Sequence, residues 1–283
     1  MIYISSSCIK KNNIAEILCI LAKSGIKNIE LSGGTKYYNE LEQELIKLKR
    51  QYQLQYACHA YFPPPKEPFV VNLASCNDKL YKQSIEHYDH CIELLKKVEC
   101  YNLSVHAGFL IEINKDQIGK KINKYVIYDE LEAYSRFCYA YERLLKKCKE
   151  QRIRLLLENN VLSSENYRSF GQKNYFMMTD YKSIMHMKEY IDFELLLDLG
   201  HLHVSTKTLG LDFIQECEKL KKYVKWLHIS DNNGICDEHK MLKEDSQIVK
   251  EFYKMYHPNL NVTLETVGEV DDILYSIQLI QDR

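Results

Sequence analysis

Short apolar runs alternate with longer amphipathic stretches from one end of the chain to the other. Ile2–Ile4 is a run of β-branched and aromatic residues, and the apolar spacing of Ile14–Ala22 is typical of a helix that Gly25 can end. The predicted strands are Ile2–Ile4, Asn28–Leu31, Leu54–Cys58, Asn102–Val105, Arg154–Leu157, Phe193–Leu197, Val224–Leu227 and Asn261–Leu264. The predicted helices are Ile14–Ala22, Tyr38–Tyr52, Asp78–Val98, Tyr128–Gln151, Leu211–Leu220, Ser246–Met255 and Val270–Ile280.

This alternation predicts a parallel sheet flanked by helices. Eight strands in a chain of 283 residues fit an α/β fold of the (β/α)8 TIM-barrel type better than an open doubly wound sheet. No G-x-G-x-x-G motif follows the first strand, so the sequence does not support a dinucleotide-binding fold. We therefore expect one barrel domain that covers residues 1–283.

Two segments lack the pattern of a helix or a strand. The stretch YFPPPKEPF, residues 61–69, holds four of the five prolines and is predicted to be an irregular loop. The polar, aromatic and glycine-containing segment Val161–Thr179 suits an active-site loop or lid.

Composition narrows the classes of partner. The formal net charge is -1, from 38 Lys and Arg against 39 Asp and Glu, so no global field attracts nucleic acid, which is not expected as a partner.

The ten cysteines form no CxxC pair and are interpreted as reduced thiols. The amino terminus lacks the apolar core of a signal peptide, and no stretch has membrane-spanning length, which predicts a cytoplasmic protein without a membrane partner. The sequence leaves open whether the chain forms a homodimer.

Six of the eight predicted strands end in a side chain that can bind a metal ion. These residues are His59, His106, Glu158, Asp198, His228 and Glu265. In a barrel the carboxyl ends of the strands converge on one face, so residues far apart in sequence come within reach of each other. Each has an ordinary explanation alone, such as a helix cap or a packed imidazole, but six at the same register predict a shared site. His, Asp and Glu without a thiolate suit Zn²⁺, Mn²⁺, Co²⁺ or Mg²⁺, and an open coordination position would imply catalysis.

Further candidate residues lie next to these strand ends. His201, Asp237 and His239 are interpreted as additional metal or substrate ligands, although loop His and Asp residues are common. His203 is expected to pack. Tyr61 and Phe62, directly after His59, are expected to form a wall against the substrate.

The motifs at the strand ends resemble those of the xylose isomerase-like TIM barrels, which include sugar isomerases and epimerases and endonuclease IV. The resemblance runs along most of the chain, through CHAYF, VNLAS, SVHAGF, LLLENN, LDLGHLH, LHISDNNG with DEH, and LET. It implies a metal site that would be carried by Glu158, Asp198, His228 and Glu265. It also implies that the two glutamates act as an acid/base pair on a small polyhydroxylated substrate, and that His201 contacts a substrate oxygen.

The same resemblance carries an alternative, a phosphodiesterase like endonuclease IV that acts on abasic DNA. His59 and His106 would then join Glu158 on one ion, and His201, Asp237 and His239 would hold another, giving up to three ions. These extra ligands discriminate poorly, because sugar-acting relatives keep similar histidines. The neutral charge balance gives little for a phosphate backbone to contact. We therefore favour one ion and an isomerase or epimerase, with a barrel that only binds its ligand as a third hypothesis.

Overall fold

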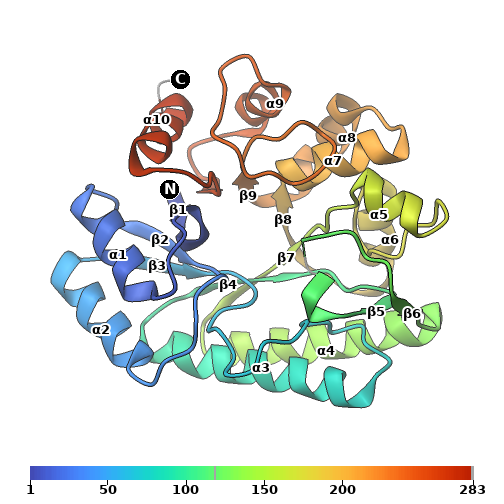
Figure 1. Cartoon of the computed structure of the whole chain (residues 1–283), viewed down its shortest axis with the longest axis horizontal. Helices are drawn as coiled ribbons and strands as arrows, with labels where there is room; N and C mark the ends of the chain where they lie inside the picture. The colour runs from blue at the N-terminus through green and yellow to red at the C-terminus, as the bar shows by residue number, and fades with distance from the viewer. Residues whose placement is uncertain (118, 282–283) are drawn as a thin grey trace.

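The strands of the chain close into a parallel barrel. The computed structural model describes residues 1–117 and 119–281, and the helices form an outer ring around the strands (Figure 1). The barrel strands are β1 (Ile2–Ser5), β2 (Asn28–Leu31), β3 (Gln55–Cys58), β4 (Asn102–His106), β7 (Arg154–Glu158), β8 (Glu194–Asp198), β9 (Val224–Ile229) and β10 (Asn261–Leu264). Closure is made by β1, which pairs in parallel with both β2 and β10. The predicted (β/α)8 TIM barrel is confirmed.

Most helices occupy the positions that the apolar spacing predicts. They are α1 (Ile14–Lys23), α2 (Leu41–Tyr52), α3 (Asp78–Lys97), α4 (Glu130–Glu150), α5 (Ser164–Ser169), α6 (Tyr181–Tyr190), α7 (Leu199–Leu209), α8 (Phe213–Leu220), α9 (Gln247–Met255) and α10 (Val270–Gln281). Three short 3₁₀ turns are η1 (Ser6–Cys8), η2 (Lys115–Gln117) and η3 (Lys221–Tyr223). No helix in the described ranges is both long and apolar enough to cross a membrane.

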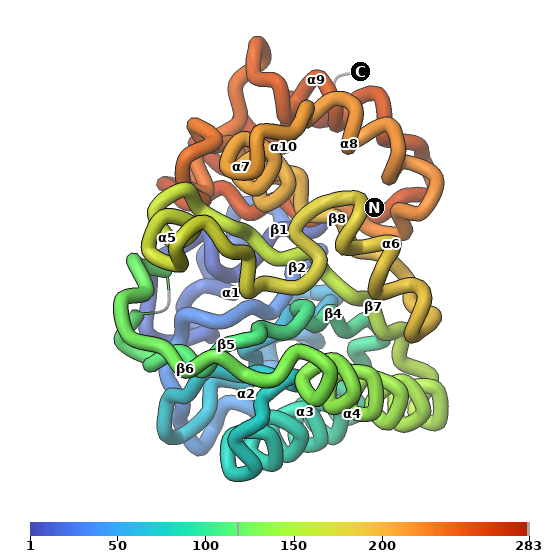
Figure 2. The backbone as a smooth tube through the Cα atoms, turned by 90° about the vertical axis from the view of Figure 1, so that its right-hand side faces the viewer, coloured from blue at the N-terminus to red at the C-terminus, as the bar shows by residue number. Residues whose placement is uncertain are grey.

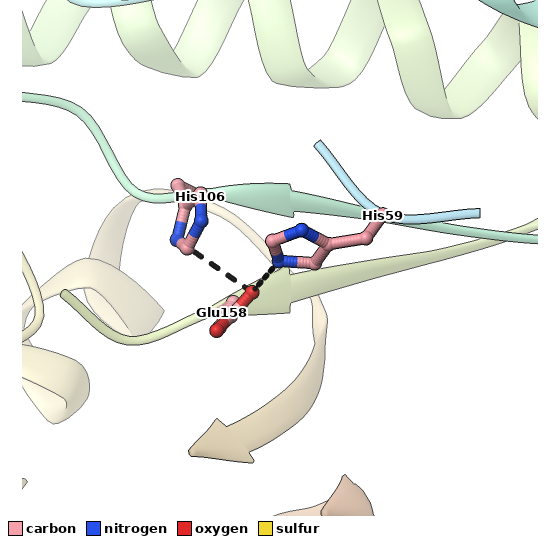
Figure 3. A group of neighbouring side chains, drawn as sticks. All are labelled: His59, His106 and Glu158. Atoms are coloured by element: carbon pink, nitrogen blue, oxygen red, sulfur yellow. Dashed lines mark hydrogen bonds and ion pairs between the residues drawn. The ribbon is translucent and has the colours of Figure 1, made fainter. Parts of the chain in front are cut away.

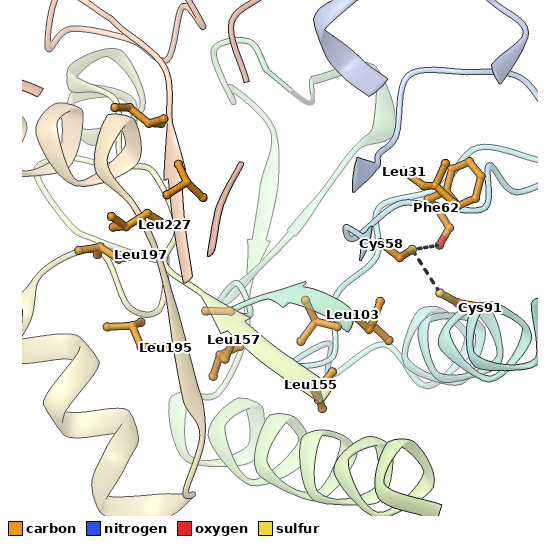
Figure 4. Close-up of a cluster of buried hydrophobic side chains, with 14 of the residues drawn as sticks. Leu31, Cys58, Phe62, Cys91, Leu103, Leu155, Leu157, Leu195, Leu197 and Leu227 are labelled. Atoms are coloured by element: carbon orange, nitrogen blue, oxygen red, sulfur yellow. Dashed lines mark hydrogen bonds between the residues drawn. The ribbon is translucent and has the colours of Figure 1, made fainter. Parts of the chain in front are cut away.

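Alternate residues of each barrel strand face opposite sides of the sheet. Outward-facing side chains that pack against the helices include Leu31, Leu103, Leu155, Leu157, Leu195, Leu197 and Leu227 (Figure 4). A second cluster consists of Tyr3, Ala57, Leu156, Leu196 and Trp226. The rings of Tyr3 and Trp226 come from strands that are not neighbours, and their centroids lie 5.1 Å apart, so this cluster fills the barrel interior.

The interior layer fixes where the next inward-facing side chains lie. Because side chains alternate with a period of two, the residues two positions after Leu156, Leu196 and Trp226 also point inward. These residues are Glu158, Asp198 and His228. The carboxyl-terminal mouth of the barrel is therefore lined with polar side chains directly above an apolar floor.

Three elements differ from the sequence prediction. The predicted lid, Val161–Thr179, contains the short helix α5, and the segment that follows it forms α6. The helix predicted at Leu211–Leu220 is α8, and α7 precedes it. A regular amphipathic pattern is missing from α7, because its polar residues His201, His203, Ser205 and Thr206 are buried like its apolar ones.

A hairpin that the sequence pattern did not predict stands outside the barrel. Its strands are β5 (Ile111–Ile113) and β6 (Tyr125–Ile127), which pair antiparallel. Figure 2 shows the hairpin apart from the barrel strands, on the same side of the molecule as α5. Ile111 packs in a small separate hydrophobic cluster with Phe170, the residue that ends α5. This cluster attaches the hairpin and the lid segment to each other beside the barrel mouth.

Candidate active site

Glu158, at the end of β7, is the centre of a buried polar cluster. One of its oxygens, Oε2, lies 2.6 Å from His59 Nε2 and 3.6 Å from His106 Nδ1 (Figure 3). Its other oxygen, Oε1, lies 3.6 Å from His228 Nδ1 and 3.6 Å from His201 Nδ1. Four imidazoles from four different segments thus surround one fully buried carboxylate.

A second carboxylate approaches the same imidazole of His228. Glu265, which follows β10, places Oε2 3.5 Å from His228 Nδ1. Asp198 ends β8 and caps α7, because its Oδ1 accepts a hydrogen bond from the His201 backbone N–H at 2.6 Å. The capping role that is ordinary for an aspartate uses only one of its two oxygens.

Several buried atoms of this cluster have no hydrogen-bond partner. They include Glu158 Oε1, Asp198 Oδ2 and His228 Nδ1. One ligand atom from each of these three residues lies within 4.8 Å of the other two, which is a spacing that a single ion can bridge. Unpaired buried carboxylate oxygens are costly, and a divalent cation compensates them. The donor set of carboxylates and imidazole without thiolate fits Zn²⁺, Mn²⁺, Co²⁺ or Mg²⁺.

The residues interpreted as additional ligands form a third group next to the first two. His201 Nε2 lies 3.3 Å from Asp237 Oδ2, and His239 Nε2 lies 2.9 Å from the same oxygen. The structure therefore brings together all nine residues that the sequence singled out as ligands, on one face of the barrel. His203, expected to pack, is buried and contacts Asn232 Oδ1 through Nδ1 at 2.9 Å.

Burial and the opposed charges shift the acid–base equilibria of the site in different directions. Burial raises the pKa of Asp198 to about 6, since the imidazole of His201 offsets the lost hydration only in part. Burial would also raise the pKa of Glu158, but the surrounding imidazoles hold it well below its ordinary value. Burial opposes the charge of His239 too, yet contact with Asp237 raises its pKa to about 9. The cluster therefore combines carboxylates of very different basicity.

A cavity of about 830 Å³ opens above these residues. Glu158, His59 and Glu265 contribute to its floor, and Tyr61 and the proline-rich loop line one side of it. The prediction that Tyr61 and Phe62 together form a wall against the substrate is wrong for Phe62. Its side chain is fully buried in the hydrophobic core and does not line the cavity, so Tyr61 alone of the pair faces it.

Glu30 is a polar residue of the cluster that the sequence did not single out. It lies in the middle of β2, is buried, and places Oε1 3.1 Å from His228 Nε2. Its Oε2 also accepts a hydrogen bond from Thr263 Oγ1 at 3.0 Å. The sequence held one indication of this role, because Glu30 lies between two apolar residues, Ile29 and Leu31. Their side chains face the outer core, so alternation along the strand turns Glu30 toward the barrel interior.

The sequence of the chain is similar to those of a known protein family and of one further protein. Residues 19–269 match the model of a family described as xylose isomerase-like TIM barrels. An uncharacterised protein from Methanocaldococcus jannaschii is 25% identical over 232 residues, which cover 80% of this chain and 75% of that protein.

Solved structures share the fold at low sequence identity. A D-tagatose 3-epimerase-like protein gives a TM-score of 0.73 at 17% identity, over 99% of this chain and 96% of that chain. Endonuclease IV from Thermus thermophilus gives a TM-score of 0.62 at 13% identity, over 99% of this chain and 97% of that chain. The fold is thus shared with proteins of two different chemistries.

Proposed function

Because the chain belongs to the xylose isomerase-like TIM-barrel family, we propose that it is a divalent-metal-dependent isomerase or epimerase of a small polyhydroxylated carbonyl compound. The resemblance to a D-tagatose 3-epimerase-like structure supports this choice at the level of fold. The choice of chemistry depends on the residues of the site.

One observation carries the proposal: Glu158, Asp198 and His228 bring ligand atoms within 4.8 Å of one another and keep buried atoms without a partner, and Glu265 lies 3.5 Å from the same nitrogen of His228. The ion pairs that these carboxylates form within the described chain are all with histidines, and none is with Lys or Arg. Their charge is therefore left for a metal ion to balance. Glu158, Asp198, His228 and Glu265 are the residues that would hold it.

A divalent ion at this point would polarise a substrate carbonyl and so acidify the neighbouring C–H bond. Glu158 and Glu265 then divide the proton transfer between them. Both approach the same proposed ligand atom, His228 Nδ1, at 3.6 Å and 3.5 Å, so a substrate held by the ion would lie close to both carboxylates. One glutamate removes the proton as a carboxylate, the form that the lowered pKa of both residues favours, and the other must take up a proton before it returns one.

The two glutamates can be tested by substitution. Glu158→Gln and Glu265→Gln keep the shape of the side chain but remove the base, so we expect each to lower kcat by at least about 100-fold. The assay is solvent-deuterium exchange at the carbon next to the carbonyl of a panel of ketoses, followed by NMR, with the exposed Glu150→Gln on α4 as the control. Full exchange activity in either active-site variant would refute the assignment.

A second candidate, a metal-dependent phosphodiesterase, is favoured by one specific observation. Donor atoms for further ions lie on both sides of the proposed central ion. They belong to His59 and His106 on one side, and to His201, Asp237 and His239 on the other. Elemental analysis of the purified protein separates the two candidates: about three ions per chain with cleavage of abasic duplex DNA favours the phosphodiesterase, and one ion without cleavage favours the isomerase.

A further inference from the structure

Three lysines line the rim of the cavity whose floor holds the acidic cluster. Lys10 follows β1, Lys36 follows β2, and Lys66 belongs to the proline-rich loop after β3. All three are exposed, and none forms an ion pair within the described part of the chain. Lys66 contacts only the ring of Tyr37 across the mouth, with Nζ 5.1 Å from the ring centroid. Three successive strand-to-helix loops therefore each contribute one uncompensated cation to the same cavity.

Hydrogen-bond donors without partners lie between these lysines. Thr35 lines the cavity, and its Oγ1 is buried without a hydrogen-bond partner. The backbone N–H groups of Gly33, Gly34 and Thr35 donate no hydrogen bond to any other described residue. A buried hydroxyl without a partner costs free energy unless water or a ligand satisfies it. This segment thus offers neutral donors beside the positive charges.

The charges of the cavity are separated by position. Its acidic lining residues, Glu158 and Glu265, lie at the floor together with the histidines, and its lining lysines are at the rim. A ligand that fits both regions has oxygens for a metal ion at one end and an anionic group at the other. We propose that the rim of Lys10, Lys36, Lys66 and Thr35 binds a phosphate monoester, so that the substrate is a phosphorylated sugar. This inference rests on the proposed function, because a sugar at the floor directs its far end toward the rim.

A phosphate monoester fits better than the backbone of a nucleic acid. The lysines form a small cluster over one cavity, and the chain has a net charge of -1, so the wider surface has no overall positive field for a long polyanion. Pro64, Pro65 and Phe69 line the same cavity beside the lysines, which gives it an apolar side. Compact anions are bound by convergent lysine ammonium groups and hydroxyl donors such as these.

The test uses probes that the proposed reaction cannot consume. D-Glucitol 6-phosphate and D-glucitol both lack a carbonyl, so calorimetry with the metal-loaded full chain measures binding alone. We expect the phosphate ester to bind at least about tenfold more tightly than the polyol, because each charged hydrogen bond contributes measurably. The double variant Lys10→Gln/Lys36→Gln should lose this preference. The control Lys225→Gln, at an exposed position of β9, should keep it.

The other possible results of this experiment decide against either the phosphate site at the rim or the proposed reaction. A phosphate ester that binds no more tightly than D-glucitol overturns the rim site, and so does a preference that survives in the double variant, since the phosphate then contacts the metal instead. Binding of abasic duplex DNA that depends on the same lysines, without binding of the ester, also overturns it. Lysine-dependent ester binding without deuterium exchange on any sugar keeps the rim site and refutes the proposed reaction.

Discussion

The buried acid Glu30 contacts the nitrogen of His228 that faces away from the proposed metal position. His228 Nδ1 faces Glu158 and Glu265, and its Nε2 faces Glu30. A carboxylate on the far nitrogen of a metal-binding histidine fixes its ring and tautomer and makes it a better ligand. Glu30, which accepts a hydrogen bond from Thr263, would therefore orient His228 as a ligand of the ion.

We predict that Glu30→Gln weakens binding of the metal ion by about 10–100-fold, because the amide orients the imidazole less strongly than the carboxylate does. Competition with a chromophoric chelator measures this affinity directly. The matched control is Glu251→Gln on α9, which also changes a buried glutamate but pairs with Lys254 away from the site. Unchanged metal affinity in the Glu30 variant, or an equal loss in the control, would contradict the orienting role.

Some of the individual site residues could be predicted from the sequence, and others could not. Six of the ligand candidates could be predicted because each ends an apolar run, where a polar side chain is conspicuous. Glu30 was not, because NIEL is only four residues long, and its alternation alone does not tell whether Glu30 faces the solvent or the barrel interior. The prediction that Phe62 lines the cavity was wrong, because Phe62 is buried in the core. Which of two adjacent aromatic residues in a loop faces the cavity depends on the backbone conformation, which the sequence does not specify.

At the scale of elements, strands and long amphipathic helices were predictable and buried polar helices were not. The spacing in α3 and α4 predicts both helices closely, because one face is apolar and the other charged. By contrast, α7 starts at the site and buries two histidines, so its pattern has no polar face. The hairpin β5–β6 is short and depends on packing against a distant segment, which no local pattern reports.

One histidine couples α3 to the proline-rich loop. His87 is buried, its Nε2 has no hydrogen-bond partner, and its ring packs edge-on against Phe69. Burial lowers the pKa of His87 from 6.5 to about 4. In the unfolded chain the group takes up a proton near pH 6.5, and in the folded chain only near pH 4, so stability falls as the pH decreases through this window.

We therefore predict that the wild type loses up to about 3 kcal/mol more free energy of unfolding between pH 6.5 and 4 than His87→Met does. Urea unfolding at a series of pH values gives both curves. His257→Met is the control, because His257 is an exposed histidine outside α3, whereas the charge of His90 contributes to the lowered pKa of His87. Parallel curves for the wild type and His87→Met would rule out this role.

At the scale of the whole molecule, the proposed metal site would couple metal binding to folding through the barrel mouth. Glu158, Asp198 and His228 come from three strands, so an ion that they share links parts of the barrel that are distant in sequence. An ion held there would bind the folded chain and find no preformed site in the unfolded one. Removal of the metal should therefore lower the stability of the entire domain rather than of one loop.

We predict that Mn²⁺ at 100 times its Kd raises the free energy of unfolding by about 2.7 kcal/mol. The corresponding rise in Tm is about 5–10 °C for a chain of this size, measured by calorimetry with added Mn²⁺ and with a chelator. Asp198→Asn removes a ligand charge while it keeps the helix cap, so its Tm should respond much less to Mn²⁺. A wild-type Tm that is identical with metal and with chelator would contradict this coupling.

We propose that this barrel removes a proton from a carbon of a sugar and returns one at the Glu158–Glu265 pair. This proposal is tested most directly by incubating the metal-loaded wild type in D₂O with ketoses and their phosphate esters and observing the carbon next to the carbonyl by NMR. The account predicts deuterium incorporation at that carbon, together with a new isomer or epimer, in at least one of these sugars. No incorporation into any of them, from protein that cleaves abasic DNA under the same conditions, would contradict it.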